Sequence, residues 1–404
     1  MMKKLFRSAL LFFIALQITT FCFAQDEFEL VESIPTETTF DHGISGPLEV
    51  WLKMINDAKQ SIDIETFYFA NEKGEPLDEV MTAIRNAASR GVTVRIIVDS
   101  SFYAKNDKSV DELNGIENIS IFKIPLGNLA GGVMHAKYFI VDDENLFIGS
   151  QNMDWRAIKH IHEMGVRVKN KKLAETFREI FNYDVQLCGG VFTNEINSNV
   201  VNANNPLVIN SDEYGKITLY PAFSPYKLSV FGLNSEEEEL LKIIGNAKDR
   251  LLIQMYSYSL KARNEKKYYD SLDNALRDAA SRGVKIKIIF SDWAIRDDAI
   301  DFIKNLSIVP NIEIKFSTIP QYSGGFIPFA RVDHCKYFVC DDNISWISTS
   351  NWDWGYFYNS RNATLIIDNS KVNEKLSSVF NSVWNSPYVS PVDINKKYEP
   401  VKRN

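Results

Sequence analysis

Apolar and polar residues follow one another along this chain in blocks whose period changes from that of a helix to that of a strand. Residues 51–69 (WLKMINDAKQSIDIETFYF) and 240–258 (LLKIIGNAKDRLLIQMYSY) begin with apolar positions three or four apart and continue with an apolar run. The helical period predicts an amphipathic helix, and the run predicts a buried strand. Each segment is therefore expected to fold as a helix followed by a strand.

A second pair of segments repeats in the same way. Residues 84–98 (IRNAASRGVTVRIIV) and 276–290 (LRDAASRGVKIKIIF) each predict the end of a helix, a stop at glycine and an apolar strand. Shorter strands are expected at 119–122 and 312–316. Helices that alternate with strands predict a layered α/β fold. The chain is therefore expected to contain two duplicated α/β sandwich domains.

The borders of these domains follow from composition. Residues 25–193 are predicted to form the first domain and residues 211–390 the second. Between them, residues 194–210 are rich in Asn and Ser and lack periodicity, which predicts a linker. Residues 391–404 are polar and contain two prolines, which predicts a loosely ordered tail.

Residues 1–24 are typical of a secretory signal peptide. A basic start with Lys3, Lys4 and Arg7 precedes an apolar run, and cleavage is expected near Ala24. The protein is therefore expected to be exported, either periplasmic or secreted. An uncleaved membrane anchor is the alternative, but the apolar run is short for a spanning helix.

Two further features of the chain exclude other classes. Cys22 suggests a lipoprotein site, but the bulky Phe21 before it disfavours this alternative. No stretch after the signal peptide predicts a membrane span. Of the 45 basic residues, three lie in the signal peptide, which leaves 42 against 52 acidic ones. A protein that coats nucleic acid is normally basic. Any nucleic-acid contact should therefore be local, at a pocket or a strand end.

The chemistry of the chain is concentrated in one motif that occurs twice with identical spacing. Its two copies lie 199 positions apart, and each contains a histidine, a lysine, an aspartate, a hydroxyl and an amide. They are His135, Lys137, Asp142, Ser150 and Asn152 in the first half, and His334, Lys336, Asp341, Thr349 and Asn351 in the second. Imidazole, ammonium and amide groups suit the binding and cleavage of a phosphate ester.

Each motif is predicted to form a β-hairpin with a four-residue loop. Pairing of Val141 with Leu146 would place His135 opposite Asn152 and Lys137 opposite Ser150, all on one face. The second copy would place His334 opposite Asn351 and Lys336 opposite Thr349. Asp142 and Asp341 fall on the other face, where we expect them to support the turn.

One hairpin supplies one imidazole, whereas displacement at phosphorus benefits from two. A neutral imidazole can attack and a protonated one can donate to the leaving oxygen, and both forms exist near neutral pH. Duplication would bring the second hairpin to the first through a pseudo-twofold axis, which predicts one shared active site. Lys137, Lys336, Asn152 and Asn351 would then surround the phosphate oxygens.

The doubled His-x-Lys motif resembles that of the phospholipase D superfamily. The resemblance is closer to the lysosomal branch called phospholipase D three and four, in residues 149–156 (GSQNMDWR), 163–166 (EMGV) and 327–332 (IPFARV). Residues 30–35 (LVESIP) and 384–388 (WNSPY) fit as well, so that the resemblance spans residues 30–388. The signal peptide is typical of a bacterial relative.

This resemblance implies a metal-independent phosphodiesterase that works through a phosphohistidine intermediate and needs no cofactor. It further implies 5′-to-3′ exonuclease action on single-stranded DNA or RNA, with His135 as the nucleophile and His334 as the acid. Glu163 stands where the family often has a carboxylate that orients a histidine; a surface carboxylate is the alternative. The chain departs from the pattern at Ser348, in place of a glycine, and at Asn362, where an acid is expected.

Other residues give weaker indications. Aromatic side chains are expected near the catalytic strand ends, where they either stack on bases or pack in the core; these are Phe67, Tyr68, Trp155, Trp352, Trp354, Tyr356 and Phe357. His160 and His162 could bind a metal from one strand face, but an exposed pair is the favoured interpretation. No metal site is predicted, and the three cysteines of the mature chain are interpreted as small buried residues.

Two other functions remain open on sequence grounds. A phospholipase D or phosphatidyl transferase would use the same motif on phospholipid head groups, although no apolar docking segment supports it. A decayed enzyme that only binds its ligand is disfavoured because both motifs are complete. The oligomeric state is open as well, and a homodimer is one possibility.

Overall fold

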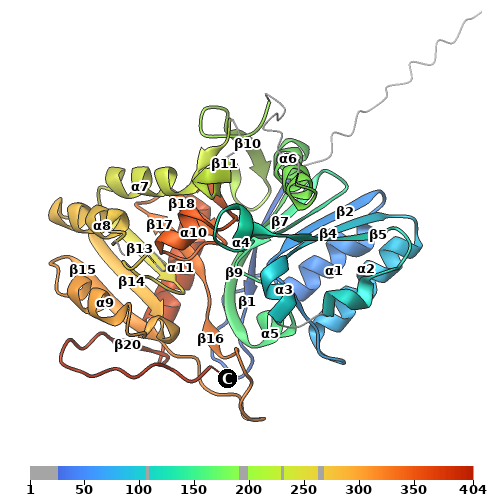
Figure 1. The fold of residues 1–404 in the computed structure, drawn as a ribbon. Coiled ribbons are helices and arrows are strands. Elements are labelled where there is room, and N and C mark those ends of the chain that lie inside the picture. Colours follow the sequence, from blue (N-terminus) through green and yellow to red (C-terminus); the bar gives the residue numbers. More distant parts are fainter. Residues whose placement is uncertain (1–25, 106–108, 191–198, 229–231, 263–267, 404) are drawn as a thin grey trace, which may run out of the picture.

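A computed structural model describes residues 26–403 except 106–108, 191–198, 229–231 and 263–267. Two mixed sheets of similar size lie side by side, one in each half of the chain (Figure 1). The predicted signal peptide lies outside the described residues and stays a prediction. In the described part of the chain, no helix has the length and apolar character that a membrane span requires.

The first sheet combines a parallel part with an antiparallel part. Its strands lie in the order β1 (Glu27–Ser33), β9 (Ile161–Lys169), β7 (Asn145–Gly149), β6 (Lys137–Val141), β2 (Ser61–Thr66), β4 (Thr93–Asp99) and β5 (Ile119–Ile124). Strands β2, β4 and β5 run parallel, whereas β6, β7, β9 and β1 are antiparallel to their neighbours. A small separate pair joins β3 (Phe69–Ala70) to β8 (Met153–Asp154).

The second sheet repeats this order and extends it. Its strands are β10 (Leu207–Ser211), β11 (Gly215–Ser224), β19 (Asn362–Asp368), β18 (Ile344–Ser348), β17 (Lys336–Cys340), β13 (Arg250–Met255), β14 (Lys285–Ser291), β15 (Ile312–Ser317) and β20 (Val389–Pro391), with β12 (Asn234–Ser235) beside β11. The succession β19-β18-β17-β13-β14-β15 matches β9-β7-β6-β2-β4-β5 strand for strand. The predicted duplication is therefore confirmed.

Helices cover the sheets on both faces. In the first half they are α1 (Pro47–Asp57), α2 (Pro76–Ser89), α3 (Ser100–Lys105), α4 (Leu126–Leu129), α5 (Trp155–Lys159) and α6 (Lys171–Cys188). In the second half they are α7 (Glu236–Asn246), α8 (Ser271–Ser281), α9 (Ile300–Ser307), α10 (Trp354–Tyr358) and α11 (Ser370–Trp384). Short 3₁₀ turns occupy Ser109–Leu113, Tyr226–Leu228 and Asp292–Ala294.

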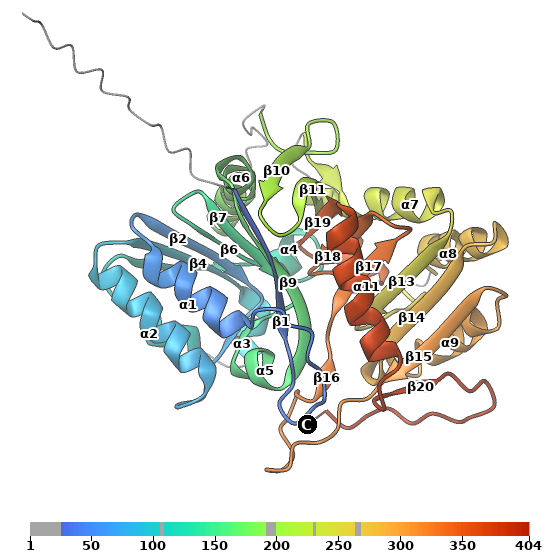
Figure 2. The same cartoon turned by 180° about the vertical axis from the view of Figure 1, so that it is seen from behind.

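The described residues form three large hydrophobic cores, besides a small cluster of Ile161, Trp293 and Val332. One lies under α1 and α2 in the first half, and its counterpart lies under α7 and α8 in the second. The third contains side chains of α6 and α11 and of strands from both sheets, so it joins the two halves. Helix α11 runs along the junction when the molecule is seen from behind (Figure 2).

The predicted helix–glycine–strand segments are present in both halves. Helix α2 ends just before Gly91 and α8 just before Gly283, at φ angles of 90° and 99°. A left-handed backbone of this kind is easy for glycine and strained for other residues, and it ends the helix. Strands β4 and β14 then begin two residues later, at Thr93 and Lys285.

The predicted hairpin register is wrong by one residue. Val141 pairs with Asn145 instead of Leu146, and in the second copy Cys340 pairs with Ile344. The loop has three residues rather than four, because Asp142 and Asp143 take up left-handed conformations with φ angles of 53° and 57° and reverse the chain early. Ladder pairing therefore does not set His135 against Asn152; the chain beyond the strand ends brings them together.

The two halves exchange strand partners at their junction. Strand β16 (Val332–Asp333), just before the second motif, joins the first sheet beside β9. His334 N donates to His162 O at 2.8 Å, and His135 N donates to Arg361 O at 2.8 Å. Each motif histidine is thus anchored by the backbone of the opposite half, which places the two histidines at the same junction.

The connection and the tail are more ordered than their composition indicates. Within the predicted linker, the described residues from 207 onward belong to β10, whose alternate side chains are buried. The tail is not loose: β20 pairs with β15, and Tyr398 packs on the second core. At its end, Arg403 O accepts a hydrogen bond from Phe329 N at 2.8 Å. The tail thereby reaches the junction of the halves, beside β16 (Figure 1).

Candidate active site

One cavity lies at the junction of the two halves. It has a volume of about 520 Å³, and both motif histidines, His135 and His334, line it together with both motif amides, Asn152 and Asn351. His135 is buried, and His334 is partly exposed to the cavity. The two motifs, which are 199 positions apart in the sequence, therefore face one space that is large enough for a phosphodiester with its neighbouring groups.

Each motif lysine begins its strand and donates to the backbone of the histidine two residues before it. Lys137 Nζ donates to His135 O at 2.5 Å, and Lys336 Nζ donates to His334 O at 2.9 Å. Burial lowers the pKa of both ammonium groups, to about 7 in Lys336. Two buried ammonium groups so close together favour an anionic ligand, because its charge offsets the cost of their desolvation.

The proton on His135 is fixed by a side chain of the opposite half. Asn362 Nδ2 donates to Tyr356 O at 3.0 Å and to Ser360 O at 3.3 Å, so its carboxamide orientation is settled by two carbonyl acceptors. Its Oδ1 lies 3.0 Å from His135 Nδ1. Because an amide oxygen only accepts, Nδ1 must carry the proton, and Nε2 of a neutral His135 presents a lone pair.

His334 has the corresponding contact with a carboxylate. Glu163, from β9 of the first half, is fully buried, and its Oε1 accepts a hydrogen bond from His334 Nδ1. Asn362 and Glu163 therefore occupy equivalent places, and each orients the histidine of the other half. The two histidines differ in that one faces a neutral amide and the other faces a carboxylate.

Burial controls the protonation of this group. Burial, followed by the positive charges of Lys137 and Lys336, lowers the pKa of His135 well below its usual value. Burial and the same two lysines also lower the pKa of His334. Burial raises the pKa of Glu163, although the lysines act in the opposite direction. Before an anion binds, both imidazoles are therefore neutral near pH 7.

The motif hydroxyls stand behind the cavity rather than in it. Ser150 Oγ accepts from Met164 N at 3.1 Å and lies against β9. Thr349 Oγ1 donates to Asn362 Oδ1 at 3.1 Å and accepts from Ala363 N at 3.1 Å. Thr349 thus helps to hold the amide that orients His135.

The motif aspartates connect each hairpin to an earlier loop. Asp142 accepts hydrogen bonds from the backbone of Lys59, Gln60 and Ser61 at 2.7–2.9 Å. Asp341 accepts in the same way from residues 248–250. Neither aspartate lines the cavity. Each aspartate binds the loop that precedes β2 or β13. The sequence did not predict this contact.

The motif amides have unused hydrogen-bonding capacity. The Oδ1 atoms of Asn152 and Asn351 are buried and meet no donor among the residues that the structure describes. Buried polar groups normally have partners. Because an amide oxygen only accepts, the missing partner is a hydrogen-bond donor, such as a hydroxyl group of a bound ligand, and not a phosphate oxygen.

Aromatic rings enclose both histidines, but only part of the predicted set does so. Phe67 and Tyr356 contact the His135 ring at centroid distances of 5.3 and 4.8 Å, and Tyr68 lines the same wall. The other four predicted aromatics are elsewhere: Trp352, Trp354 and Phe357 belong to the core of the second half, and Trp155 packs on His160. The sequence does not distinguish aromatic residues of the core from those that line the cavity. Only the fold distinguishes them.

Several residues of the cavity wall were not predicted as site residues. Tyr256 contacts the His334 ring at 4.6 Å, and the remaining wall includes Phe102, Arg156, Trp293, Phe329 and Arg403. Arg403 comes from the tail that was predicted to be loose. Tyr256 occupies the place in the second half that Phe67 has in the first, and the alignment of 51–69 with 240–258 would have located it.

A glycine before the first motif allows the two halves to approach each other closely. A side chain at Gly132 would place its Cβ 2.4 Å from the backbone of Asn359. Only glycine allows this close approach, which lets the segment before His135 lie against the second half.

The chain is similar to several known proteins. Residues 51–185 and 240–384 match the family described as "Cardiolipin synthase, PLD-like domain". The chain is 28% identical over 379 residues to the 5′-3′ exonuclease PLD3 of Xenopus laevis, covering 87% of this chain and 76% of the relative. It is 28% identical to phospholipase D Z of Dictyostelium discoideum, covering 90% of each.

A third relative and a solved structure extend the comparison. The virion nicking-joining enzyme of vaccinia virus is 28% identical, over 87% of this chain and 86% of its own. The fold is similar to the crystal structure of phosphatidylserine synthase from Haemophilus influenzae, with a TM-score of 0.62, 12% identity and 85% of each chain covered. The duplicated family match and the shared cavity lead to one conclusion: the chain belongs to the PLD-like domain family and is a phosphodiesterase of the phospholipase D superfamily.

Proposed function

We propose that this protein is a 5′-to-3′ exonuclease that hydrolyses single-stranded DNA or RNA through a phosphohistidine intermediate on His135. The observation that carries the proposal is the shared cavity, in which a histidine with a free Nε2 lone pair faces a histidine backed by a carboxylate. The relatives named 5′-3′ exonuclease support the polarity and the substrate.

The roles follow from the partners of the two rings. Asn362 holds the proton on Nδ1 of His135, so that Nε2 can attack phosphorus. Glu163 stabilises a positive imidazolium far better than an amide oxygen would, which favours His334 as the acid. A bound phosphodiester brings negative charge into the cavity. This charge raises the pKa of both imidazoles and so opposes the effect of the lysines.

The reaction has two displacement steps. His135 Nε2 forms a bond to phosphorus while the bond to the leaving oxygen breaks, and His334 gives its proton to that oxygen. Water then attacks phosphorus, His334 takes a proton from the water, and the phosphorus–nitrogen bond breaks. Lys137, Lys336 and the two motif amides stabilise the charge on the remaining phosphate oxygens in both steps.

The walls of the cavity suit a nucleic-acid end. Phe67, Tyr68, Tyr356 and Tyr256 offer ring surfaces, and base stacking on such surfaces stabilises binding by about 1–3 kcal/mol per base. Arg403 lines the same space and can pair with a phosphate, whereas Arg156 also lines it but is ion-paired with Asp154. The acidic balance of the whole chain favours contact with one strand end over contact with a long duplex.

The test uses single-stranded oligonucleotides with a free or a blocked 5′ end, each labelled at the 3′ end. The expected result is a ladder that shortens from the free 5′ end and is absent when that end is blocked. Quenching in alkaline detergent, in which a phosphorus–nitrogen bond survives, should trap a label at the reacting phosphorus on the parent protein and not on the His135→Ala variant. Degradation from the 3′ end would contradict the polarity, and label retained by His135→Ala would contradict the nucleophile.

A phospholipase D or phosphatidyl transferase activity is the second candidate, because one relative with 90% coverage is named phospholipase D Z. Phosphatidylglycerol vesicles assayed beside the oligonucleotides, with water or glycerol as the acceptor, separate the two. Turnover of lipid without cleavage of oligonucleotide would replace the nuclease proposal. Binding of either substrate without turnover by the parent protein would favour a decayed enzyme.

A further inference from the structure

We propose that Glu32, His42 and His162 form a buried binding site for a divalent transition metal, separate from the reaction cavity. Its role would be to hold three segments of the chain together, and it would take no part in the chemistry at phosphorus. None of the three residues lines the catalytic cavity. The inference does not depend on the nuclease proposal.

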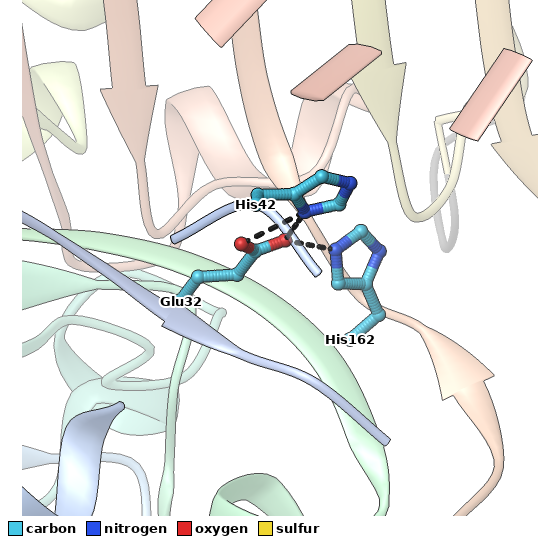
Figure 3. A group of neighbouring side chains, drawn as sticks. All are labelled: Glu32, His42 and His162. Carbon is cyan, nitrogen blue, oxygen red and sulfur yellow. Dashed lines mark hydrogen bonds and ion pairs between the residues drawn. The ribbon is translucent and has the colours of Figure 1, made fainter. Parts of the chain in front are cut away.

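The three donor atoms converge from separate segments. The Glu32 carboxylate, on β1, lies between the two imidazole rings (Figure 3). Its Oε1 is 2.8 Å from His42 Nδ1, which follows in the segment between β1 and α1, and 2.8 Å from His162 Nε2 on β9. All three donor atoms lie within 4.8 Å of one another.

This donor set is one that zinc accepts. Two imidazole nitrogens and one carboxylate oxygen are a common set for Zn²⁺, with a fourth position for water. Bonds of about 2.1 Å in a tetrahedron require donor atoms about 3.4 Å apart. The observed 2.8 Å separations therefore need to open by roughly half an ångström, which is within side-chain movement.

Burial makes this group unlike a surface cluster of acids and histidines. The side chains of Glu32 and His162 are fully buried, and that of His42 is 6% exposed. Asp333 is buried beside them and is 2% exposed. Two buried carboxylates require two compensating positive charges. One divalent ion bound by these donors supplies both charges.

A second carboxylate is placed to support the ligand His162. Its Nδ1 lies 3.5 Å from Asp333 Oδ1 and 3.3 Å from Gln254 Nε2, which itself donates to Asp333 Oδ2 at 2.8 Å. Metal-binding histidines usually donate their other N–H to a carboxylate, and this contact fixes the ring. With Nε2 on the metal, the proton of His162 is on Nδ1, which faces the Asp333 carboxylate at 3.5 Å.

The site adjoins the catalytic pair through the backbone. Asp333 and His162 are register partners in the β16–β9 pairing that joins the two halves. The next residues along these strands are His334 and Glu163, whose side chains are hydrogen-bonded in the active site. A metal at Glu32, His42 and His162 would fix β9 in this pairing. The ligands are therefore positioning residues for Glu163 and His334.

The test measures bound metal and stability, not only turnover. Protein purified without chelators and freed of any histidine tag should contain about one zinc per chain by mass spectrometry. Removal of metal with dipicolinate should lower the melting temperature by about 4 °C, and added Zn²⁺ should restore it. Co²⁺ in place of zinc should give the visible absorption of a tetrahedral site.

Matched variants separate this site from the reaction centre. Glu32→Gln and His42→Gln should each lose the bound metal and its stabilising effect, while His160→Gln, which removes a nearby histidine outside the cluster, should retain both. His135→Ala should abolish turnover and keep the metal. The proposal would be overturned if the parent protein contained less than about 0.1 metal per chain and its melting temperature did not change with Zn²⁺. This test does not depend on whether the variants fold.

Discussion

Asn362 of the second half accepts a hydrogen bond from Nδ1 of His135 in the first half, at 3.0 Å. The sequence position of Asn362 corresponds to that of Glu163, which makes the same contact with His334. The active site is thus symmetric in its backbone and asymmetric in its charge. The asymmetry is what distinguishes a nucleophile from an acid in an otherwise duplicated arrangement.

Asn362→Ala is expected to lower kcat by about 10- to 100-fold. The substitution removes the acceptor that holds the His135 proton on Nδ1, so a larger share of His135 carries it on Nε2 and cannot attack. Steady-state kinetics on an oligonucleotide would measure the loss, and KM should change little. An unchanged kcat would show that Asn362 does not set the tautomer.

Glu163→Gln is expected to lower kcat by about 100- to 1000-fold. The amide keeps a hydrogen bond to His334 but cannot stabilise the imidazolium, so the pKa of His334 falls and less of it is protonated. A substrate with a better leaving group needs less help from an acid and should recover much of the rate. If the variant lost the same factor on both substrates, the acid role would belong to another group.

The pH profile of kcat/KM should have its maximum on the acidic side of neutrality. Burial lowers the pKa of His135, so this histidine remains neutral and able to attack below pH 6.5. The pKa of His334 is lowered as well, and Lys336 loses its proton near pH 7. Proton donation by His334 therefore weakens already as the pH rises toward 6.5, and the attraction of Lys336 for phosphate weakens as the pH rises through about 7.

Lys336 can be isolated in this profile by substitution. Lys336→Met should lower kcat/KM by about 100-fold at pH 6 and by less at pH 8, where the parent lysine is already mostly neutral. The surface variant Lys397→Ala is the control and should follow the parent at both values. An equal loss at both pH values would mean that Lys336 stays charged throughout.

The sequence predicted the duplicated fold and the meeting of the two histidines, because both follow from local periodicity and a repeated spacing. It did not predict the hairpin register, since the left-handed turn at Asp142 and Asp143 shortens the loop by one residue. The sequence also did not predict that β16 joins the first sheet or that Arg403 lines the cavity. Those contacts join residues that are far apart and have no shared period.

Arg403→Ala is expected to raise KM for oligonucleotides by about 5- to 10-fold with little change in kcat. The guanidinium lines the cavity and lies over the Trp293 ring, 4.9 Å from its centroid, where it can contact a phosphate next to the reacting one. A minimal substrate with a single phosphodiester should show a smaller effect. The dependence of KM on salt should weaken in the variant, and an unchanged salt dependence would argue against a phosphate contact.

Arg361→Met is expected to destabilise the protein by about 3–5 kcal/mol. Arg361 is 1% exposed and reaches across the junction, where its Nε and Nη2 donate to Asp184 at 2.8 and 2.7 Å. Its Nη1 also donates to Ser224 O at 2.9 Å. The substitution leaves the buried Asp184 without a counter-charge, and denaturant unfolding would measure the loss.

The double variant Arg361→Met with Asp184→Leu tests the cause of that loss. If the uncompensated carboxylate is responsible, removal of both charges should recover most of the stability, because a buried ion pair contributes little beyond its own desolvation. If stability instead falls further, the loss comes from the backbone contacts of Arg361. Because Arg361 O also accepts from His135 N, turnover by the double variant would show whether His135 stays in place when the ion pair is removed.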